Sequence, residues 1–192
     1  MLIANGADVN TSDKTRVTSP LWIAANNGFY KIAVMLINNG ADVDTEAELT
    51  GLTPLMIAAR NNEGDIVRSL ILTGGADVDK TNRISGNTAL HLAIMNNAND
   101  SVKILLNEFK VDHDKMNSVT RTTPAYVAVK VGNLPALGLL VQKGASIPIE
   151  LDSATPLLIN RESEIDHTQS VSIAALNAQL RLAIAGPNPQ LP

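Results

Sequence analysis

Thr53-Pro54-Leu55 is one of five related tripeptides that return along the chain at a nearly constant interval. The other four are Ser19-Pro20-Leu21, Thr88-Ala89-Leu90, Thr123-Pro124-Ala125 and Thr155-Pro156-Leu157. Their second residues lie at positions 20, 54, 89, 124 and 156, so the spacings are 34, 35, 35 and 32 residues. A second motif keeps the same interval, in the forms Gly40-Ala41-Asp42-Val43, Gly75-Ala76-Asp77-Val78, Lys110-Val111-Asp112-His113 and Gly144-Ala145-Ser146-Ile147. This period indicates an array of stacked repeats, which offers a long binding surface rather than a deep catalytic pocket.

The composition of the 192-residue chain suits closely packed helices. Hydrophobic residues make up 45% and aromatic residues 3%, so the apolar mass is Ala, Leu, Ile and Val. The net charge of −4, without any run of Lys or Arg, gives no support for non-specific binding to nucleic acid or to an anionic membrane. No apolar run reaches the roughly 18 residues of a transmembrane helix, and no signal peptide is apparent. Because the chain has no cysteine, we expect a cytoplasmic location.

The first helix of each repeat is predicted from its two ends. Ser19 is a good N-cap, and Pro20 suits the first helical position, where a missing N–H costs nothing. Residues 26–28, Asn-Asn-Gly, should end this helix after about two turns. The small pair Ala24-Ala25 of its inner side recurs as Ala58-Ala59, Ala93-Ile94 and Ala128-Val129.

A second helix follows in each repeat and carries an apolar face. In the first repeat Ile32, Met35 and Leu36 have the i, i+3, i+4 spacing of one helical face. Gly40 should end this helix in a left-handed conformation. Later repeats reproduce the face as Val67, Leu70, Ile71; Val102, Leu105, Leu106; and Leu137, Leu140, Val141. A single helix pair is too small to bury these side chains alone, so neighbouring pairs must stack.

The combination of Thr-Pro-Leu, a pair of small residues and Gly-Ala-Asp-Val at fixed offsets resembles the ankyrin repeat family. The resemblance implies an all-α-dominated solenoid, in which each repeat has two antiparallel helices and a projecting β-hairpin. We expect one domain over residues 1–186, with a partial repeat at 1–13, four repeats at 14–149, and a degenerate repeat with a capping helix (Val171 to Ala185) at 150–186. Residues 187–192 form a Pro-rich tail.

The chain departs from the family pattern at several positions. The family usually places a histidine after Thr-Pro-Leu, where it links adjacent repeats by hydrogen bonds, and here His91 keeps it. The other repeats have Trp22, Met56, Tyr126 and Leu158 in that place. Lys110 replaces a glycine, so the turn before Asp112 should differ in shape. Met1 falls in the middle of a repeat and leaves Leu2 and Ile3 without a cover, which suggests either a fragment or a short N-terminal cap; we favour a fragment.

Nothing in the sequence predicts catalysis, a metal site or a cofactor. His91 is interpreted as structural rather than catalytic. In Asp112-His113-Asp114 alternate side chains of an extended arm face opposite ways, so a solvated arm is preferred to a metal cluster. Gly74-Gly75 is not followed by the Lys-Ser/Thr of a phosphate-binding loop.

The family resemblance suggests two further sites, a methyl-lysine cage and a hydroxylated asparagine, and neither is favoured in this chain. An aromatic cage for methyl-lysine would need Trp22 and Tyr126 together, but they lie three repeats apart and are interpreted as packing residues. Asparagine at the end of Gly-Ala-Asp-Val-Asn is a recurrent hydroxylation target in the family. Only Asn10 has it here, within a partial repeat.

In this family partners usually lie along a concave face made by the hairpin fingers and the outer turn of each first helix. Carried over to this chain, the helix positions are Asn26, Asn27, Arg60, Asn61, Met95, Asn96, Lys130 and Val131. The finger positions are Arg16, Thr18, Thr50, Leu52, Ser85, Asn87, Thr120 and Thr122. They vary between repeats while the framework stays constant, which is typical of a scaffold with a specialised surface. The competing interpretation is that Asn is simply abundant in the loops.

The leading hypothesis is therefore a non-enzymatic interaction module whose concave face binds a protein or peptide with hydrogen-bonding groups and some acidity. The alternative is a targeting domain of a larger multidomain enzyme or secreted effector whose activity lies outside this chain. No nucleic acid or membrane partner is expected. The chain should be a monomer, with homo-oligomers through the N-terminal end as a third hypothesis.

Overall fold

The computed structural model describes residues 7–11 and 18–146 of the chain. The chain divides into two compact units, residues 1–145 and 146–192, and every helix described lies in the first. These helices are α1 (Pro20–Asn26), α2 (Tyr30–Asn38), α3 (Pro54–Arg60), α4 (Gly64–Leu72), α5 (Ala89–Met95), α6 (Asn99–Glu108), α7 (Pro124–Val131) and α8 (Leu134–Gln142). The predicted helix pairs are thus confirmed over residues 18–146.

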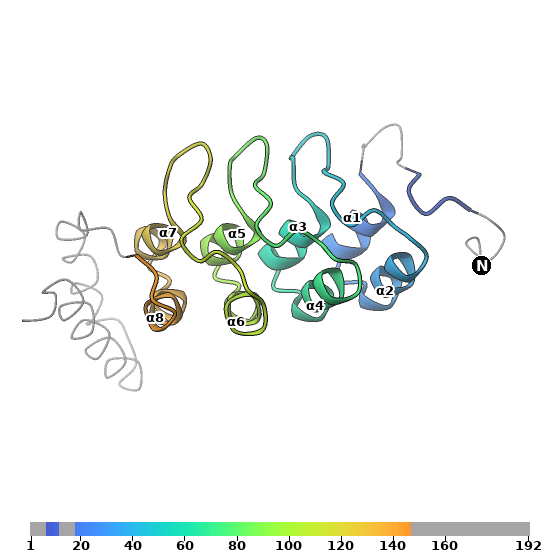
Figure 1. The fold of residues 1–192 in the computed structure, drawn as a ribbon. Coiled ribbons are helices and arrows are strands. Elements are labelled where there is room, and N and C mark those ends of the chain that lie inside the picture. Colours follow the sequence, from blue (N-terminus) through green and yellow to red (C-terminus); the bar gives the residue numbers. More distant parts are fainter. Residues whose placement is uncertain (1–6, 12–17, 147–192) are drawn as a thin grey trace, which may run out of the picture. The chain divides into compact units, whose positions relative to one another are not determined.

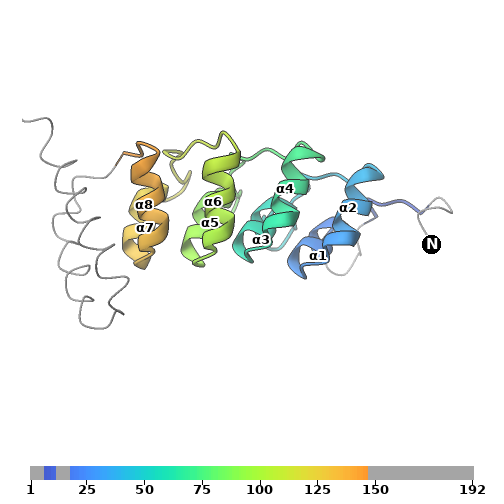
Figure 2. The same ribbon diagram turned by 90° about the horizontal axis from the view of Figure 1, so that it is seen from below.

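The helices of the first unit form two rows (Figure 1). Helices α1, α3, α5 and α7 pack side by side in one row, α2, α4, α6 and α8 pack in the other, and each pair also packs together. The same two rows appear from a perpendicular direction in Figure 2. Leu55, Ala59 and Leu70 are at most 1% exposed, so the core lies between the rows and between successive pairs. Burial is shared between neighbours, as expected of a repeat array.

The first helix of each pair begins where the sequence predicts. The side-chain hydroxyls of Ser19, Thr53, Thr88 and Thr123 each accept a hydrogen bond from the backbone N–H three residues later. Proline follows the cap in three of these four helices. Each cap satisfies a helix N–H that would otherwise be unpaired and is worth about 1 kcal/mol.

The turn within each pair requires a left-handed backbone. Gly28, Asn62, Asn97 and Gly132 occupy the same place in successive repeats, with φ values of 69°, 63°, 56° and 72°. Glycine and asparagine tolerate this conformation better than other residues. The local sequence therefore determines where the chain reverses between the two helices.

The second helix ends in two ways. Gly40, Gly75 and Gly144 have φ values of 81°, 73° and 81°, as expected of glycine at a helix C-terminus. Helix α6 instead ends at Glu108, and Phe109 is extended with φ −124° and ψ 152°. The prediction that Lys110 changes the shape of this turn is confirmed.

The projecting segments are short loops, here called fingers, over residues 47–52, 82–87 and 117–122. The two ends of each finger are joined by a backbone hydrogen bond: Ala47 N–H to Leu52 O (2.9 Å), Asn82 N–H to Asn87 O (2.7 Å) and Asn117 N–H to Thr122 O (2.8 Å). A second backbone bond closes the turn inside each finger, from the N–H groups of Gly51, Gly86 and Arg121 to the carbonyls of Ala47, Asn82 and Asn117. The segments are too short to add a ladder of further bonds, and no strand forms within residues 7–11 and 18–146. In this part of the chain the array is therefore all-α, with hairpin-like loops in place of β-hairpins.

Several predictions fall on residues that the structure does not describe. They concern Leu2, Ile3 and Arg16, the motif Thr155-Pro156-Leu157, and the capping helix from Val171 to Ala185. The extent of the single domain to residue 186 also stays a prediction.

Candidate partner-binding face

The fingers are held in shape by asparagine side chains at their bases. Asn82 is 1% exposed. Its Oδ1 accepts the backbone N–H groups of Ile84 (2.8 Å) and Ser85 (2.7 Å), and its Nδ2 donates to Thr50 O of the preceding finger (2.9 Å). One buried amide therefore shapes its own finger and ties it to the neighbouring finger.

Asn117 repeats this arrangement one repeat later. It is 2% exposed. Its Oδ1 accepts from the N–H groups of Val119 and Thr120, both at 2.8 Å, and its Nδ2 donates to Ser85 O at 3.0 Å. Ala47 stands in the equivalent place of the first described finger. This role was not predicted from the sequence, although the sequence shows the 35-residue spacing of Asn82 and Asn117.

At the tip of each finger an aliphatic side chain points away from the core. Leu49, Ile84 and Val119 are 79%, 52% and 61% exposed. We call these three residues the tip row. They lie at identical places in the repeat, 35 residues apart (49, 84 and 119). The sequence reading missed them as well, because an apolar residue in a repeat is ordinarily assigned to the core.

The predicted partner-binding residues differ in their accessibility. Those that are exposed are Asn27, Thr50, Arg60, Asn61, Met95, Asn96, Thr120 and Lys130. Those that are half-buried are Thr18, Asn26, Ser85, Thr122 and Val131. Leu52 and Asn87 are only 6% and 9% exposed, because they close the base of their fingers, so their side chains offer little surface to a partner. Arg16 lies outside the described residues.

Several of the predicted amides already have structural partners. The Nδ2 of Asn61 donates to Asn26 O of the preceding repeat (2.9 Å). The Nδ2 groups of Asn27 and Asn96 donate to carbonyls one turn earlier, Ile23 O (2.8 Å) and Leu92 O (2.9 Å). The abundance of asparagine is therefore explained in part by the architecture itself.

The last turns of α1, α3, α5 and α7 present a row of varied side chains. Asn26, Arg60, Met95 and Lys130 stand at equivalent places, 34, 35 and 35 residues apart. Met95 is 45% exposed, and the cationic groups of Arg60 and Lys130 form no hydrogen bond or ion pair with the described residues. We use the term finger face for the three fingers together with these last turns.

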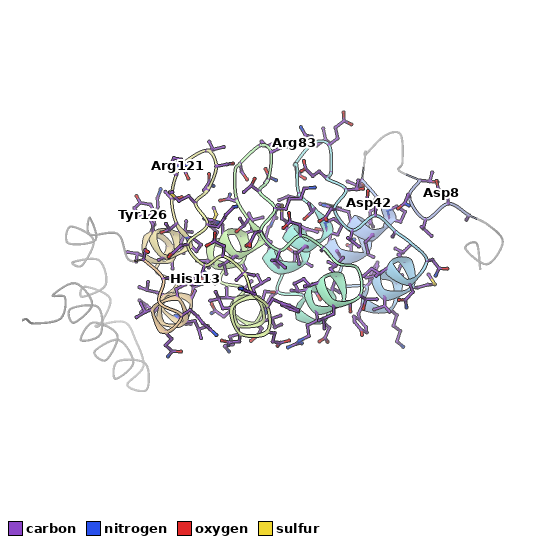
Figure 3. The ribbon with its side chains drawn as sticks, viewed as in Figure 1. Asp8, Asp42, Arg83, His113, Arg121 and Tyr126 are labelled. Carbon is purple, nitrogen blue, oxygen red and sulfur yellow. The ribbon has the colours of Figure 1, made fainter. Side chains whose placement is uncertain are left out.

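Cations nearer the finger bases are neutralised. The Nε of Arg83 lies 3.0 Å from Glu46 Oε2, and the Nζ of Lys80 lies 3.7 Å from Glu46 Oε1. Arg121, in the next finger, forms no ion pair within the described residues. Figure 3 shows Arg83 and Arg121 on the projecting fingers.

An acidic ladder follows the arms between repeats. The side chain of Asn10 accepts from Asp42 N–H (2.8 Å), and that of Asp79 accepts from Asp112 N–H (3.0 Å). Burial raises the pKa of Asp79, whereas the hydrogen bond from Asp44 N–H is the main cause that lowers the pKa of Asp42. The carboxylates thus have structural partners, and within the described residues no group of three His, Cys, Asp or Glu side chains could hold a metal ion.

His91 links two repeats, as predicted. It is fully buried; its Nδ1 lies 2.8 Å from Thr88 Oγ1, and its Nε2 lies 3.2 Å from Thr122 O at the base of the next finger. Burial lowers the pKa of His91, so the ring is neutral at pH 7. The Nε2–H can then donate to the carbonyl while Nδ1 accepts from the threonine hydroxyl.

A polar depression between α4 and α6 has a different character. Two cations line it: the Nζ of Lys103 lies 3.5 Å from Asp100 Oδ1, and Arg68 forms two 2.7 Å bonds with Glu108 and one 3.0 Å bond with Asp65. This hydrogen bonding lowers the pKa of Glu108 and raises that of Arg68. The charged groups of the depression are therefore paired with one another and leave no unpaired charge for a ligand.

No helix within the described residues is long and apolar enough to cross a bilayer.

The comparisons with known proteins agree with this geometry. The family model for ankyrin repeats, three copies long, matches residues 1–82 and again residues 62–150. A search of curated proteins found no match to the chain. Taken together, the matched residues span most of the chain, and the capped helix pairs with a finger between them repeat over the same region. The chain belongs to the ankyrin repeat family.

Proposed function

We propose that this chain is a non-enzymatic interaction module that binds a protein or peptide partner on its finger face. Ankyrin repeats are generally protein–protein interaction modules, and the matched residues contain no other kind of domain. The observation that carries the proposal is the row Asn26, Arg60, Met95 and Lys130. At these equivalent positions the chain has an amide, a guanidinium, a thioether and an ammonium. The N-cap of each of the same four helices is, in contrast, always a serine or threonine.

The energetics of this row also support binding. Arg60 and Lys130 are exposed and have no partner among residues 7–11 and 18–146, and the half-exposed Met95 between them adds apolar contact area. An arginine flanked by a flexible apolar side chain is a common centre of binding energy at interfaces. The absence of cysteine supports a cytoplasmic location for the module.

The test is affinity capture from the source cells followed by mass spectrometry. The bait is the native chain, compared with Arg60→Glu/Met95→Ala/Lys130→Glu. A matched control, Lys31→Glu/Leu72→Ala/Lys143→Glu, makes the same change in charge at exposed residues in or next to α2, α4 and α8. Circular dichroism first establishes that all three proteins are equally helical.

A partner retained by the native chain and the control, but lost from the finger-face variant, is the expected result. Equal capture by all three proteins would show that this face is not used. The proposed function would then be wrong in its location.

A further inference from the structure

The tip row is an ordered feature that the proposed function does not explain by itself. Single exposed apolar residues are common on protein surfaces, but Leu49, Ile84 and Val119 occur at one place in three consecutive repeats. The fingers that carry them project side by side (Figure 1). A regular line of aliphatic groups in water is costly unless something covers it.

Two of the three tips are held in place by buried side chains. Asn82 and Asn117, both buried, hold the backbone at Ile84 and Val119 through hydrogen bonds of 2.8 Å. A surface that is already ordered loses little conformational entropy on binding. These two fingers therefore offer a preformed site, and the finger of Leu49, with Ala47 at its base, lacks this support.

The spacing of the tips limits the shape of the partner. Each finger leads directly into one of the packed helices α3, α5 and α7, and packed helices lie about 8–10 Å apart. A polyproline II segment has three residues per turn and rises about 9 Å per turn, so every third side chain would face the next tip. In a β-strand the third residue faces the opposite side. On an α-helix the side chains of one face recur about every 5.4 Å, after three or four residues, so successive turns are too close together to match successive tips.

Hydroxyl groups beside the tips favour the same kind of partner. Thr50 Oγ1 accepts from Leu52 N–H (3.4 Å), and Ser85 Oγ accepts from the Nδ2 of Asn87 (3.2 Å), so both keep a hydroxyl hydrogen to donate. A polyproline II segment offers free backbone carbonyls to such donors. An α-helix uses its carbonyls internally.

The charge of the finger face selects against a basic partner. Its unpaired charges are three cations, Arg60, Arg121 and Lys130, against one anion, Glu48, although the whole chain carries −4. Complementarity therefore favours carboxylates on the segment that binds.

We propose that the tip row binds an extended acidic segment of another protein in the polyproline II conformation, with an apolar side chain at every third residue. The three apolar side chains cover Leu49, Ile84 and Val119. Backbone carbonyls of the segment accept hydrogen bonds from the hydroxyls of Thr50 and Ser85. Its acidic residues lie against the cations of the finger face, which are Arg60, Arg121 and Lys130. This inference rests on the proposed function and specifies the partner of the same face.

The test is selection of a random 12-residue peptide library displayed on phage, using the whole chain as bait. Enriched peptides are synthesised, and their dissociation constants are measured by fluorescence anisotropy against the native chain, Leu49→Ser/Ile84→Ser/Val119→Ser and the control Leu72→Ser. Leu72 is 73% exposed and lies on α4, away from the tip row, so it matches Leu49 in type and exposure. If the triple variant melts at a lower temperature than the native chain, the single variant Ile84→Ser takes its place.

Enriched peptides should carry apolar residues at i, i+3 and i+6 with Asp or Glu between them. Their affinity should fall at least tenfold in the triple variant and stay unchanged in Leu72→Ser. Peptides with helical spacing (i, i+4, i+7), equal affinity for the triple variant, or no enrichment at all would each overturn the inference.

Two other occupants are tested with the same variants. Phosphatidylcholine/phosphatidylserine vesicles that sediment the native chain but not the triple variant would assign the row to a membrane. Self-association seen by light scattering and abolished in the triple variant would assign it to a second copy. If cellular capture is lost in the Arg60/Met95/Lys130 variant but kept in the tip-row variant, the proposed function stands and this inference fails.

Discussion

The Nε2 of His91 and the backbone oxygen of Thr122 lie 3.2 Å apart, although the two residues are 31 positions apart in the chain. This bond joins the start of α5 to the base of the finger in the following repeat. The equivalent residue one repeat earlier is Met56, which is 1% exposed and cannot donate such a bond. Neighbouring repeats of one array are therefore joined by different forces.

Replacement of His91 by methionine copies the preceding repeat and should destabilise the array. The change removes the bonds of the ring to Thr122 O and Thr88 Oγ1, while Thr122 O keeps the bond from Asn117 N–H, and the expected cost is about 1–3 kcal/mol. Urea unfolding at pH 7, followed by circular dichroism, measures the difference. Met56→Leu serves as a conservative control that should cost less, and equal stability of the native chain and the His91 variant would contradict the role of this bond.

The contribution of His91 to the free energy of unfolding should also depend on pH. Because burial lowers its pKa in the folded state, the unfolded state binds the proton more readily once the pH falls below about 6.5. The free energy of unfolding should therefore decrease as pH falls from 7 to 5, by more in the native chain than in His91→Met. The difference in stability between the two proteins should shrink over this range. A constant difference would show that His91 is not the group that titrates.

Removal of a finger-base asparagine should loosen two fingers at once. In Asn117→Ala the N–H groups of Val119 and Thr120 lose their acceptor, and Ser85 O loses a donor. The expected loss is about 2–3 kcal/mol, since each bond contributes roughly 1 kcal/mol. Thermal melts measure it, and hydrogen exchange should rise in residues 117–122 and 82–87. Asn107→Ala removes an exposed amide that forms no hydrogen bond with the described residues, so it is the control and should change stability by less than about 0.5 kcal/mol. A similar effect of both variants would refute the assignment.

Two glycines with the same left-handed backbone should respond differently to alanine. Gly75 has φ 73° and open space where a Cβ would stand, so Gly75→Ala should cost about 1 kcal/mol from the backbone alone. Gly86 has φ 74°, but its Cβ would contact Asn117 Oδ1 and come within 2.6 Å of Val119 N. Gly86→Ala should therefore cost several times more, because it disturbs the buried asparagine. Chemical denaturation of the two variants compares their free energies of unfolding directly. Equal losses of stability would mean that the finger backbone shifts to accommodate the added methyl group.

Features set by neighbouring residues could be predicted from the sequence. The capping hydroxyl of Thr53 acts on the residue three positions later, and the left-handed turn within each described helix pair has Gly or Asn. Such interactions depend on local geometry, so the repeat period, the helix pairs and the altered turn at Lys110 follow from the order of residues alone.

Which residues face a partner depended on contacts between repeats. Asn82 and Asn117 reach carbonyls 32 residues earlier and hold the fingers in which Ile84 and Val119 are exposed, while Leu52 and Asn87 close the finger bases. A local pattern cannot distinguish an aliphatic residue at a tip from one in the core, because both are apolar residues in a short loop. Stacking alone brings the buried amides against the neighbouring finger, and the hydrogen bonds that they form there define the exposed surface.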